Sequence, residues 1–410
     1  RGAETRLVVA EAKDIPLEVL RIRETASHYL RLLAHHKRHT LVRKLHTRKH
    51  APVHACVTSI KATVPAFTVA PAVPPTPPWT FPSPVTYTSI PGLKGRKQEI
   101  PSAAIKQLTP DFIATSYGSR TAVYTDGSST SEASTAAFTL PSESVSCGYL
   151  LSHRTSSTSA ELYAVLMFMK HATTYAPQSW ILYTDSKAAL QCMAQMGIRG
   201  SLAPVVTDIL RLLKAMEEQG HTFIFQWIPG HCGIPDNDAA DAVAAAAHQN
   251  RASVRIILSR GDRRGHLRQM SASLAVEQWH RDVPSQSLLH SVDPDLSCRL
   301  PKAVPRPLKT LFHRLRLNVS FTPYYRHQLG CSISHLCTQC HVPATAEHLF
   351  LVCSRFRRER DIMATEFANL DARPFSLSSI LGPWDNPSKH RTALRSVANF
   401  VRSAGQLDTL

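Results

Sequence analysis

The 410-residue sequence contains no run of apolar residues long enough to cross a lipid bilayer, and no apolar signal segment follows Arg1. This excludes a membrane-spanning segment and gives no sign of secretion, so we expect an intracellular protein of the nucleus or cytoplasm. Cysteine is also sparse, with nine scattered residues. An odd and scattered set favours a reducing compartment over a disulfide scaffold.

Acidic residues are scarce as well. The chain has 30 Asp and Glu against 47 Lys and Arg, which gives a net charge of +17 and a pI near 9.7. Such a charge points to a polyanionic partner, with nucleic acid favoured over an anionic membrane surface. No acidic residue occurs between Glu24 and Glu99. Residues 1–50 are predicted to be a basic helical segment that contacts a phosphate backbone, the alternative being an ordinary solvated helix face.

Residues 51–118 are rich in proline, most densely from Pro71 to Pro84. Proline fixes one backbone dihedral and removes an amide donor, so the stretch cannot hold a helix or a central strand. It is predicted to be an extended linker, and a proline-rich ligand for a recognition domain is the less favoured alternative.

Residues 119–250 have the pattern of an α/β domain. Three strands separated by turns predict an antiparallel meander, and a helix, a strand, two helices, a strand and an alanine-rich helix follow. Four acids lie at the end of the first strand, early in the first helix, at the end of the fourth strand and in the last helix: Asp126, Glu161, Asp185 and Asp241. Each acid taken alone is more often a turn or helix-capping residue.

Taken together, the four acids predict a metal site. Ends of adjacent strands lie close in an open sheet, and converging carboxylates without a cation would repel one another. Oxygen-only ligands suit Mg²⁺ or Mn²⁺, and two such ions can activate water and stabilise the leaving oxygen of a phosphodiester. A basic protein with this site is predicted to be a nuclease.

Four blocks resemble ribonuclease H of the kind carried by non-LTR retrotransposon polyproteins. They are TDGS at 125–128, SAEL at 159–162, TDS at 184–186 and PGHCGIPDNDAAD at 229–241. The resemblance implies a ribonuclease H-like fold, a five-stranded mixed sheet with flanking helices, over residues 119–250. It makes Asp126, Glu161, Asp185 and Asp241 the catalytic ligands of two Mg²⁺ or Mn²⁺ ions. It makes His231 a histidine that assists proton transfer or product release.

The resemblance further implies cleavage of the RNA strand of an RNA–DNA hybrid, which leaves a 3′-hydroxyl and a 5′-phosphate. The sequence departs from the pattern where serine, alanine and threonine at 129–137 replace expected glycines. No basic helical insertion lies between Asp185 and His231, so other basic regions are expected to help hold the substrate.

The C-terminal part is predicted to contain a connector over residues 251–300 and a basic, mainly helical region over 301–410. Within KTLFHRLRLNVSFTPYYRHQLG, residues 309–330, cations alternate with apolar and aromatic residues. This suits phosphate contact with base stacking as well as it suits an ordinary amphipathic helix.

A second metal site is predicted from a cysteine and histidine cluster with CxxC, seven-residue and four-residue spacing: Cys337, Cys340, His348 and Cys353. Such a set can close a tetrahedral Zn²⁺ site, with Cys331, His335 and His341 as competing ligands and free thiols as the alternative. It resembles the CCHC cluster downstream of the enzyme domains in non-LTR retrotransposon proteins.

These observations predict the C-terminal part of a non-LTR retrotransposon polyprotein. The start at Arg1 indicates that an N-terminal part is absent, and residues 1–50 are interpreted as a possible polymerase remnant. No YxDD-type polymerase motif occurs, so we expect no reverse transcriptase activity in this chain. The expected partners are RNA–DNA hybrid, RNA, DNA and the upstream reverse transcriptase. A silent ribonuclease H scaffold that only binds nucleic acid and an integrase or transposase remain as alternatives.

Overall fold

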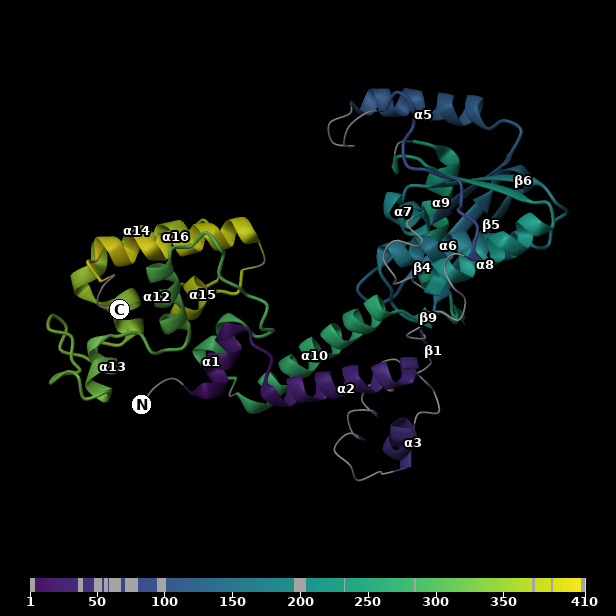
Figure 1. The fold of residues 1–410 in the computed structure, drawn as a ribbon. Helices are drawn as coiled ribbons and strands as arrows, with labels where there is room; N and C mark the ends of the chain where they lie inside the picture. The colour runs from purple at the N-terminus through teal and green to yellow at the C-terminus, as the bar shows by residue number, and fades with distance from the viewer. Residues whose placement is uncertain are drawn as a thin grey trace. The chain divides into compact units, whose positions relative to one another are not determined.

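The structure is a computed structural model that describes residues 4–35, 40–47, 54, 58, 68–70, 80–93, 101–194, 204–231, 233–283, 285–370, 373–384, 386–406 and 410. Parts of the basic N-terminal segment and of the proline-rich stretch, including residues 36–39, 48–53 and 71–79, lie outside this set. The chain divides into two units, residues 22–270 and residues 1–21 with residues 271–410 (Figure 1). Among the described residues, no helix combines the length and the apolarity that a membrane crossing requires.

The first unit is built on a seven-stranded mixed sheet with the order β2-β7-β6-β3-β4-β5-β8. As predicted, the strands of the meander pair antiparallel, while β6 and β7 are parallel to β3 and to each other. The two edge strands add two residues each. The strand bounds are β2 Thr86–Tyr87, β3 Thr121–Asp126, β4 Thr135–Leu140, β5 Val145–Leu151, β6 Ser179–Thr184, β7 Thr222–Trp227 and β8 Ser253–Val254.

Alternation along the central strands sends apolar side chains to both faces of the sheet. Val123 and Leu182 join one core with helices α6 and α8, whereas Tyr124 and Tyr183 stack on the opposite face in a core that includes α9. Sheet faces covered on both sides explain why β6 is buried almost throughout. The helix bounds are α6 Ser157–Ala172, α7 Lys187–Ala194, α8 Pro204–Glu218 and α9 Pro235–Ala246.

The structure differs from the predicted linker in the part that it describes. Helix α5, Ser102–Ser116, follows the linker prolines, and β2 pairs in parallel with β7 at the edge of the sheet. Val85 accepts a backbone hydrogen bond from Phe225, and the buried Ile90 packs in the same core as Tyr124. An edge strand tolerates neighbouring prolines because one side of it needs no amide donors.

The predicted connector also contains regular structure. Strand β9, Ile257–Leu258, pairs with β1, Thr68–Val69, and helix α10 runs over Arg260–Asp282. Ser259 and Asp262 begin α10 with reciprocal hydrogen bonds between each side chain and the other's backbone amide. The sequence did not indicate this helix, because abundant charged residues obscure the few apolar residues at helical spacing.

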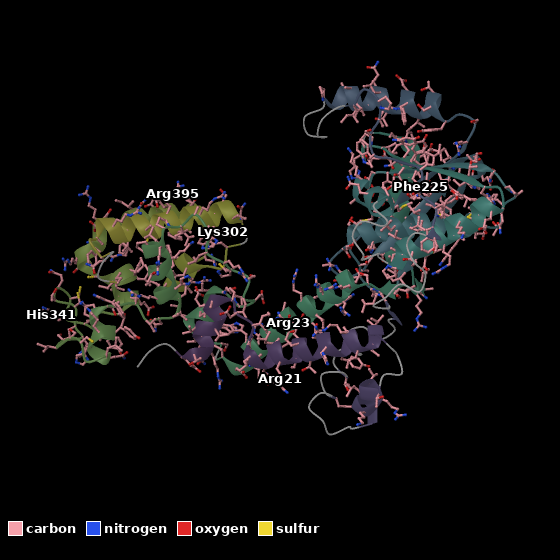
Figure 2. All side chains as sticks on the ribbon, in the orientation of Figure 1. Arg21, Arg23, Phe225, Lys302, His341 and Arg395 are labelled. Carbon is pink, nitrogen blue, oxygen red and sulfur yellow. The ribbon has the colours of Figure 1, made fainter. Side chains whose placement is uncertain are left out.

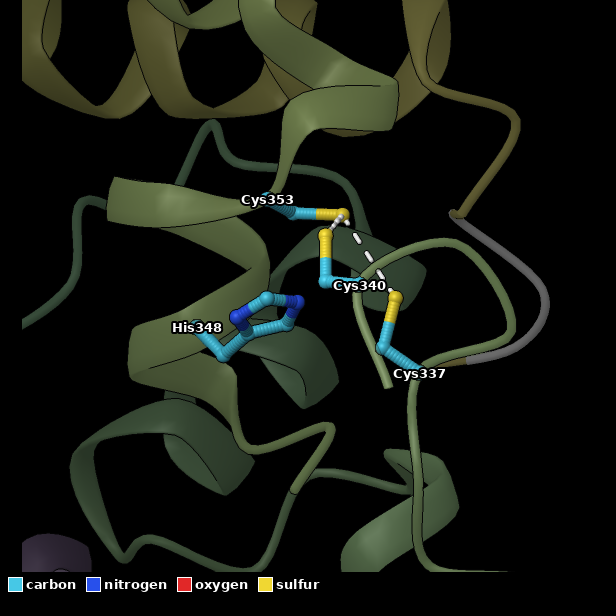
Figure 3. Close-up of side chains that lie close together, drawn as sticks. All are labelled: Cys337, Cys340, His348 and Cys353. Carbon is cyan, nitrogen blue, oxygen red and sulfur yellow. Dashed lines mark hydrogen bonds between the residues drawn. The ribbon is translucent and has the colours of Figure 1, made fainter. Parts of the chain in front are cut away.

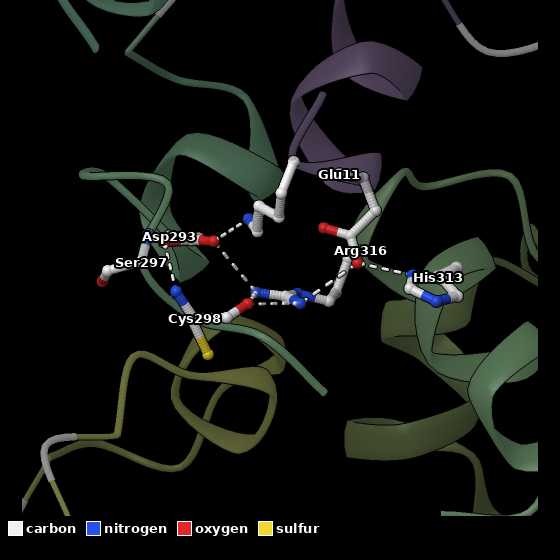
Figure 4. Close-up of polar contacts among 7 residues, drawn as sticks. Glu11, Asp293, Ser297, Cys298, His313 and Arg316 are labelled. Carbon is white, nitrogen blue, oxygen red and sulfur yellow. Dashed lines mark hydrogen bonds and ion pairs between the residues drawn. The ribbon is translucent and has the colours of Figure 1, made fainter. Parts of the chain in front are cut away.

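The second unit is mainly helical, as predicted, and includes a segment from the N-terminus. Helix α1 packs in it. Glu11 pairs with Arg316 (Figure 4), and Lys13 pairs with Asp293, with all four side chains nearly inaccessible to solvent. The apolar side chain of Phe225 is buried in the first unit, whereas the charged side chain of Arg395 is exposed on α16 (Figure 2). The helix bounds are α1 Thr5–Ala12, α11 Leu288–Val292, α12 Arg306–Arg316, α13 Pro323–Gln328, α14 Arg357–Ala368, α15 Leu377–Leu381 and α16 Pro387–Ser403. Helices α2 Leu17–His35 and α3 Thr40–Thr47 follow α1 in the chain, and α3 belongs to the first unit.

Candidate active site and metal-ligand clusters

Three of the four predicted acids meet at one edge of the sheet. Asp126 ends β3 and Asp185 directly follows β6, and the parallel pairing of Thr125 with Thr184 sets the two strand ends side by side. Glu161 comes from the second turn of α6, whose N-terminus is capped by the Ser156 side chain. One carboxylate oxygen from each of the three acids lies within 4.8 Å of the others.

Two glycines make this close approach possible. A Cβ atom on Gly127 would lie 2.3 Å from the backbone nitrogen of Glu161, and a Cβ atom on Gly230 would lie 2.0 Å from Oδ2 of Asp185. Neither space can hold a side chain larger than hydrogen unless the backbone or the carboxylate moves. The sequence signal for these roles was the glycine directly after Asp126 and the glycine beside His231.

The electrostatics of the three acids indicate a cation site. Burial is the main cause that raises the pKa of Asp126 to about 7, and the carboxylates of Asp185 and Asp241 add to it. His231 and a hydrogen bond from the Gly127 amide oppose this rise. Burial, then Asp126 and Asp185, raise the pKa of Glu161 well above its ordinary value. A divalent cation would reverse this by favouring the ionised carboxylates.

The fourth acid lies near this cluster without joining the closest group. Asp241 on α9 raises the pKa of Asp126, yet the close group among the described residues contains only the other three acids. Its side chain is 47% exposed, and its Oδ2 lies 3.7 Å from Nδ1 of His231. His231 is 74% exposed at its side chain and has a positive φ of 54°. The predicted histidine is therefore on the open side of the site.

Other side chains pack around the site. The indole N–H of Trp227 donates to the backbone carbonyl of Asp185 over 3.0 Å, and the Lys187 ammonium lies 3.8 Å from the centroid of the Trp227 ring. Thr184 Oγ1 lies 3.5 Å from Glu161 Oε2. The position of Trp227 at the end of a strand beside the acidic loop was the available signal.

A family match covers this region of the chain. Residues 118–249 match the RNase H family model. The structure is similar to RNase H1 from the halophilic archaeon Halobacterium salinarum NRC-1, with 18% sequence identity, 32% of this chain and 97% of that chain covered, and a TM-score of 0.26. It is also similar to the N-terminal RNase H domain of rv2228c from Mycobacterium tuberculosis, solved as a fusion with maltose-binding protein, with 18% identity, 31% and 98% covered, and a TM-score of 0.24. No curated protein matches the chain.

The chain thus contains an RNase H domain with an RNase H-like fold. The match supports a nuclease that binds nucleic acid. The RNase H family generally uses divalent metals, and the three clustered carboxylates are ligands that such metals bind.

Hydroxyl groups hold the loop of the RNase H domain from which the expected glycines are missing. Ser129 and Ser134 form an isolated bridge, and each hydroxyl donates to the Thr155 carbonyl. Thr130 accepts hydrogen bonds from two backbone amides within the loop. His248, which was not predicted, lies 3.1 Å through Nε2 from Ser128 Oγ and joins the end of α9 to this loop. The altered turn leaves the three clustered acids in place.

The predicted cysteine and histidine ligands converge in the second unit (Figure 3). Cys353 Sγ lies 3.7 Å from Cys337 Sγ and 3.9 Å from Cys340 Sγ. Tetrahedral Zn²⁺ with bonds of about 2.3 Å places two sulfurs roughly 3.8 Å apart. His348 Nε2 is buried and has no hydrogen-bond partner among the described residues. This donor set fits Zn²⁺.

The competing ligands do not join the cysteine and histidine group. Cys331 is exposed, and its thiol lies 3.8 Å from the Leu329 carbonyl. His335 packs against the rings of Tyr324 and His327, and His341 is exposed. In the CxxC segment, the Cys337 amide donates to the Val342 carbonyl and the His341 amide donates to the Cys337 carbonyl, so the two cysteines lie on one tight turn.

Proposed function

We propose that this protein cleaves the RNA strand of RNA–DNA hybrids with two Mg²⁺ or Mn²⁺ ions held by its RNase H domain. The observation that carries this proposal is the meeting of Asp126, Glu161 and Asp185, from three separate elements, within 4.8 Å. Asp241 is proposed as the fourth ligand, because it lies on α9 close enough to raise the pKa of Asp126. Substrate selection would rest on backbone shape and 2′-hydroxyls more than on base sequence.

The residues divide the work of phosphodiester hydrolysis. When bound, the metal pair would activate a water and stabilise the leaving oxygen. Asp126 and Asp185 are half-buried and Glu161 is buried, so with the metals bound their carboxylates would fix the place at which the scissile phosphate is presented. His231 is exposed beside Asp241, where its ring can accept or deliver a proton at the edge of the site. The expected products carry a 3′-hydroxyl and a 5′-phosphate.

The activity is tested by hydrolysis of a labelled RNA–DNA hybrid in Mg²⁺. Asp126→Asn should abolish cleavage of the RNA strand, while Asp238→Asn should retain it, because Asp238 is an exposed acid on the same helix as Asp241. A second readout is stabilisation by Mg²⁺ or Mn²⁺ in thermal unfolding, which should be lost in Asp126→Asn alone. A folded wild-type protein that gains stability from neither metal and cleaves no hybrid would contradict the proposal and favour a silent scaffold.

We also propose that Cys337, Cys340, His348 and Cys353 bind one Zn²⁺ ion. The sulfur separations and the buried, unpartnered His348 Nε2 support this. Purified protein should contain about one zinc per chain, and Cys353→Ser should lose it. The matched change Cys331→Ser should leave the zinc content unchanged, because that thiol is exposed outside the cluster. Protein without zinc, whose thiols all titrate freely, would contradict the assignment.

The context proposed for the chain is a non-LTR retrotransposon polyprotein with an upstream reverse transcriptase as its partner. The order of the four acidic blocks and the CCHC spacing downstream support this. The test is the source gene: the reading frame upstream of Arg1 should encode a polymerase with a YxDD-type motif. A frame that starts at or just before Arg1, with no polymerase, would contradict it.

A further inference from the structure

A polar cavity of about 550 Å³ lies in the second unit, away from the clustered cysteines themselves. Its walls come from the loop after α12, helix α13, the turn before His348 and the start of α15. Among the described residues that line it, six are Ser or Thr and three are amides: Gln286, Asn318 and Gln328. Hydroxyl and amide groups offer both donors and acceptors without charge.

Two aromatic side chains also line the cavity. Tyr324 and Tyr325 lie next to each other on α13. The Tyr325 ring is stacked on Phe321, with centroids 6.2 Å apart and planes at 15°. The Arg314 guanidinium lies 4.1 Å from the centroid of the Phe321 ring. A guanidinium and two stacked rings form a rigid platform of the kind on which nucleobases stack.

The charges separate a place for a base from a place for a phosphate. Glu347 is the one charged residue among the described residues that line the cavity, so a phosphate inside it would be repelled. The exposed Arg326 directly follows Tyr325 on α13 and lies outside the lining set. A cavity lined by hydroxyls and amides, with one carboxylate and no cation among its lining residues, suits a nucleoside whose backbone phosphates stay in solvent.

The cavity is also tied to the cysteine and histidine cluster. Thr345, which lines it, accepts a hydrogen bond from the backbone amide of His348. Glu347 directly precedes His348 in the same turn. The proposed Zn²⁺ ligand and one wall of the cavity therefore belong to one short segment.

We propose that this cavity binds one unpaired nucleotide of a single-stranded nucleic acid, with its base beside Tyr325. The inference goes beyond the hydrolysis proposed for the RNase H domain and adds a second nucleic-acid contact on another unit. It explains why residues 309–330 combine cations with aromatic residues. Amide groups of Gln286 and Gln328 would hydrogen-bond the base edge.

Binding of labelled single-stranded RNA and DNA oligonucleotides of about 12 nucleotides tests the proposal in the full chain carrying Asp126→Asn. The double change Tyr325→Ala and Gln328→Ala should weaken binding about fivefold or more. Because neither change alters charge, the slope of affinity against salt should stay the same. Arg326→Ala should instead reduce that slope, since phosphate contacts set it and Arg326 directly follows Tyr325 on α13.

Two further measurements distinguish a lost nucleotide contact from a misfolded variant. Tyr325→Phe keeps the ring and should bind within about twofold of the parent chain. Photo-crosslinking of an oligonucleotide with 5-iodouridine should place adducts on the cavity segments, residues 318–328, 345–347 or 376–378. A preference for RNA or for DNA identifies the source of the nucleotide. Equal binding by the double variant and the parent, with crosslinks elsewhere, would overturn the proposal and leave the cavity to a ligand of another class.

Discussion

Gly127 lies where the end of β3 meets the backbone of α6, and a Cβ atom there would come within 2.4 Å of the Ala160 carbonyl carbon. Gly127→Ala should therefore push Asp126 away from Glu161. Displacement of catalytic groups by about 1 Å can cost about 100-fold in rate, and overpacking costs about 1–3 kcal/mol of stability. Hybrid cleavage and urea unfolding should show both losses.

The matched control is Gly118→Ala, where the added Cβ would meet its nearest neighbour, the Ala114 carbonyl, at an ordinary 3.9 Å. That variant should retain activity and stability. Equal activity of Gly127→Ala and Gly118→Ala would show that the spacing between Asp126 and Glu161 does not depend on the glycine.

At the residue scale the sequence predicted that acids would meet, as three of the four do, but not which residues hold them in position. Asp126 and Asp185 were predictable because Asp126 ends one apolar strand and Asp185 directly follows another, and parallel neighbours end at the same edge. Their contacts with Gly230 and Trp227 depend on how a distant loop packs, which no local pattern encodes. The separation of Asp241 from the closest group likewise follows from the placement of α9.

At the scale of elements, Asp262 joins the beginnings of two helices. Its Oδ1 accepts from Thr155 Oγ1 and from the Ser156 amide at the start of α6, and its Oδ2 accepts from the Ser259 amide at the start of α10. The sequence shows the local capping pair but cannot show the contact over 107 residues with Thr155. For this reason α10 looked like part of a connector, although its first turns pack on the RNase H domain.

His153 packs beside this junction and makes stability depend on pH. Burial lowers its pKa to about 4, with His266 adding to the fall and Asp262 opposing it. Because the unfolded chain takes up this proton near pH 6.5 and the folded chain does so only near 4, stability should fall as pH falls through that interval. His153 should lower the free energy of unfolding by an amount on the order of 2 kcal/mol across this interval. Urea unfolding at pH 6.5 and pH 4.5 should show a smaller loss for His153→Gln than for wild type.

Other histidines with lowered pKa values, such as His266 and His390, shift stability in the same direction. The comparison between wild type and His153→Gln isolates one of them. If the two proteins lose the same stability over this interval, the pKa of His153 does not differ between the folded and the unfolded chain, and the assignment fails.

At the scale of the whole molecule, the two ends of the chain build one helical unit and the RNase H domain lies between them in sequence. Three of the residues that join the ends are charged and buried: Glu11, Arg316 and Asp293. Glu11 lies 3.1 Å from Arg316 and 2.7 Å from the His313 ring, and Arg316 lies 3.5 Å from Asp293. A pattern search assigns such residues to a solvated surface, which is why the role of the N-terminal segment was not predictable from the sequence.

Glu11→Ala should destabilise the helical unit and leave the RNase H domain intact. Removing one partner of a buried ion pair leaves the other charge without full compensation, which typically costs about 3–5 kcal/mol. Arg316 keeps Asp293 and the Cys298 carbonyl as partners, so the lower end of that range is expected. Glu4→Ala is the matched control, because its pair with Arg6 is 4.0 Å long and exposed. Hydrogen exchange should show faster opening of α12 in Glu11→Ala, with unchanged protection of β3 and β6. Unchanged protection of α12 would mean that α1 is held by apolar contacts alone.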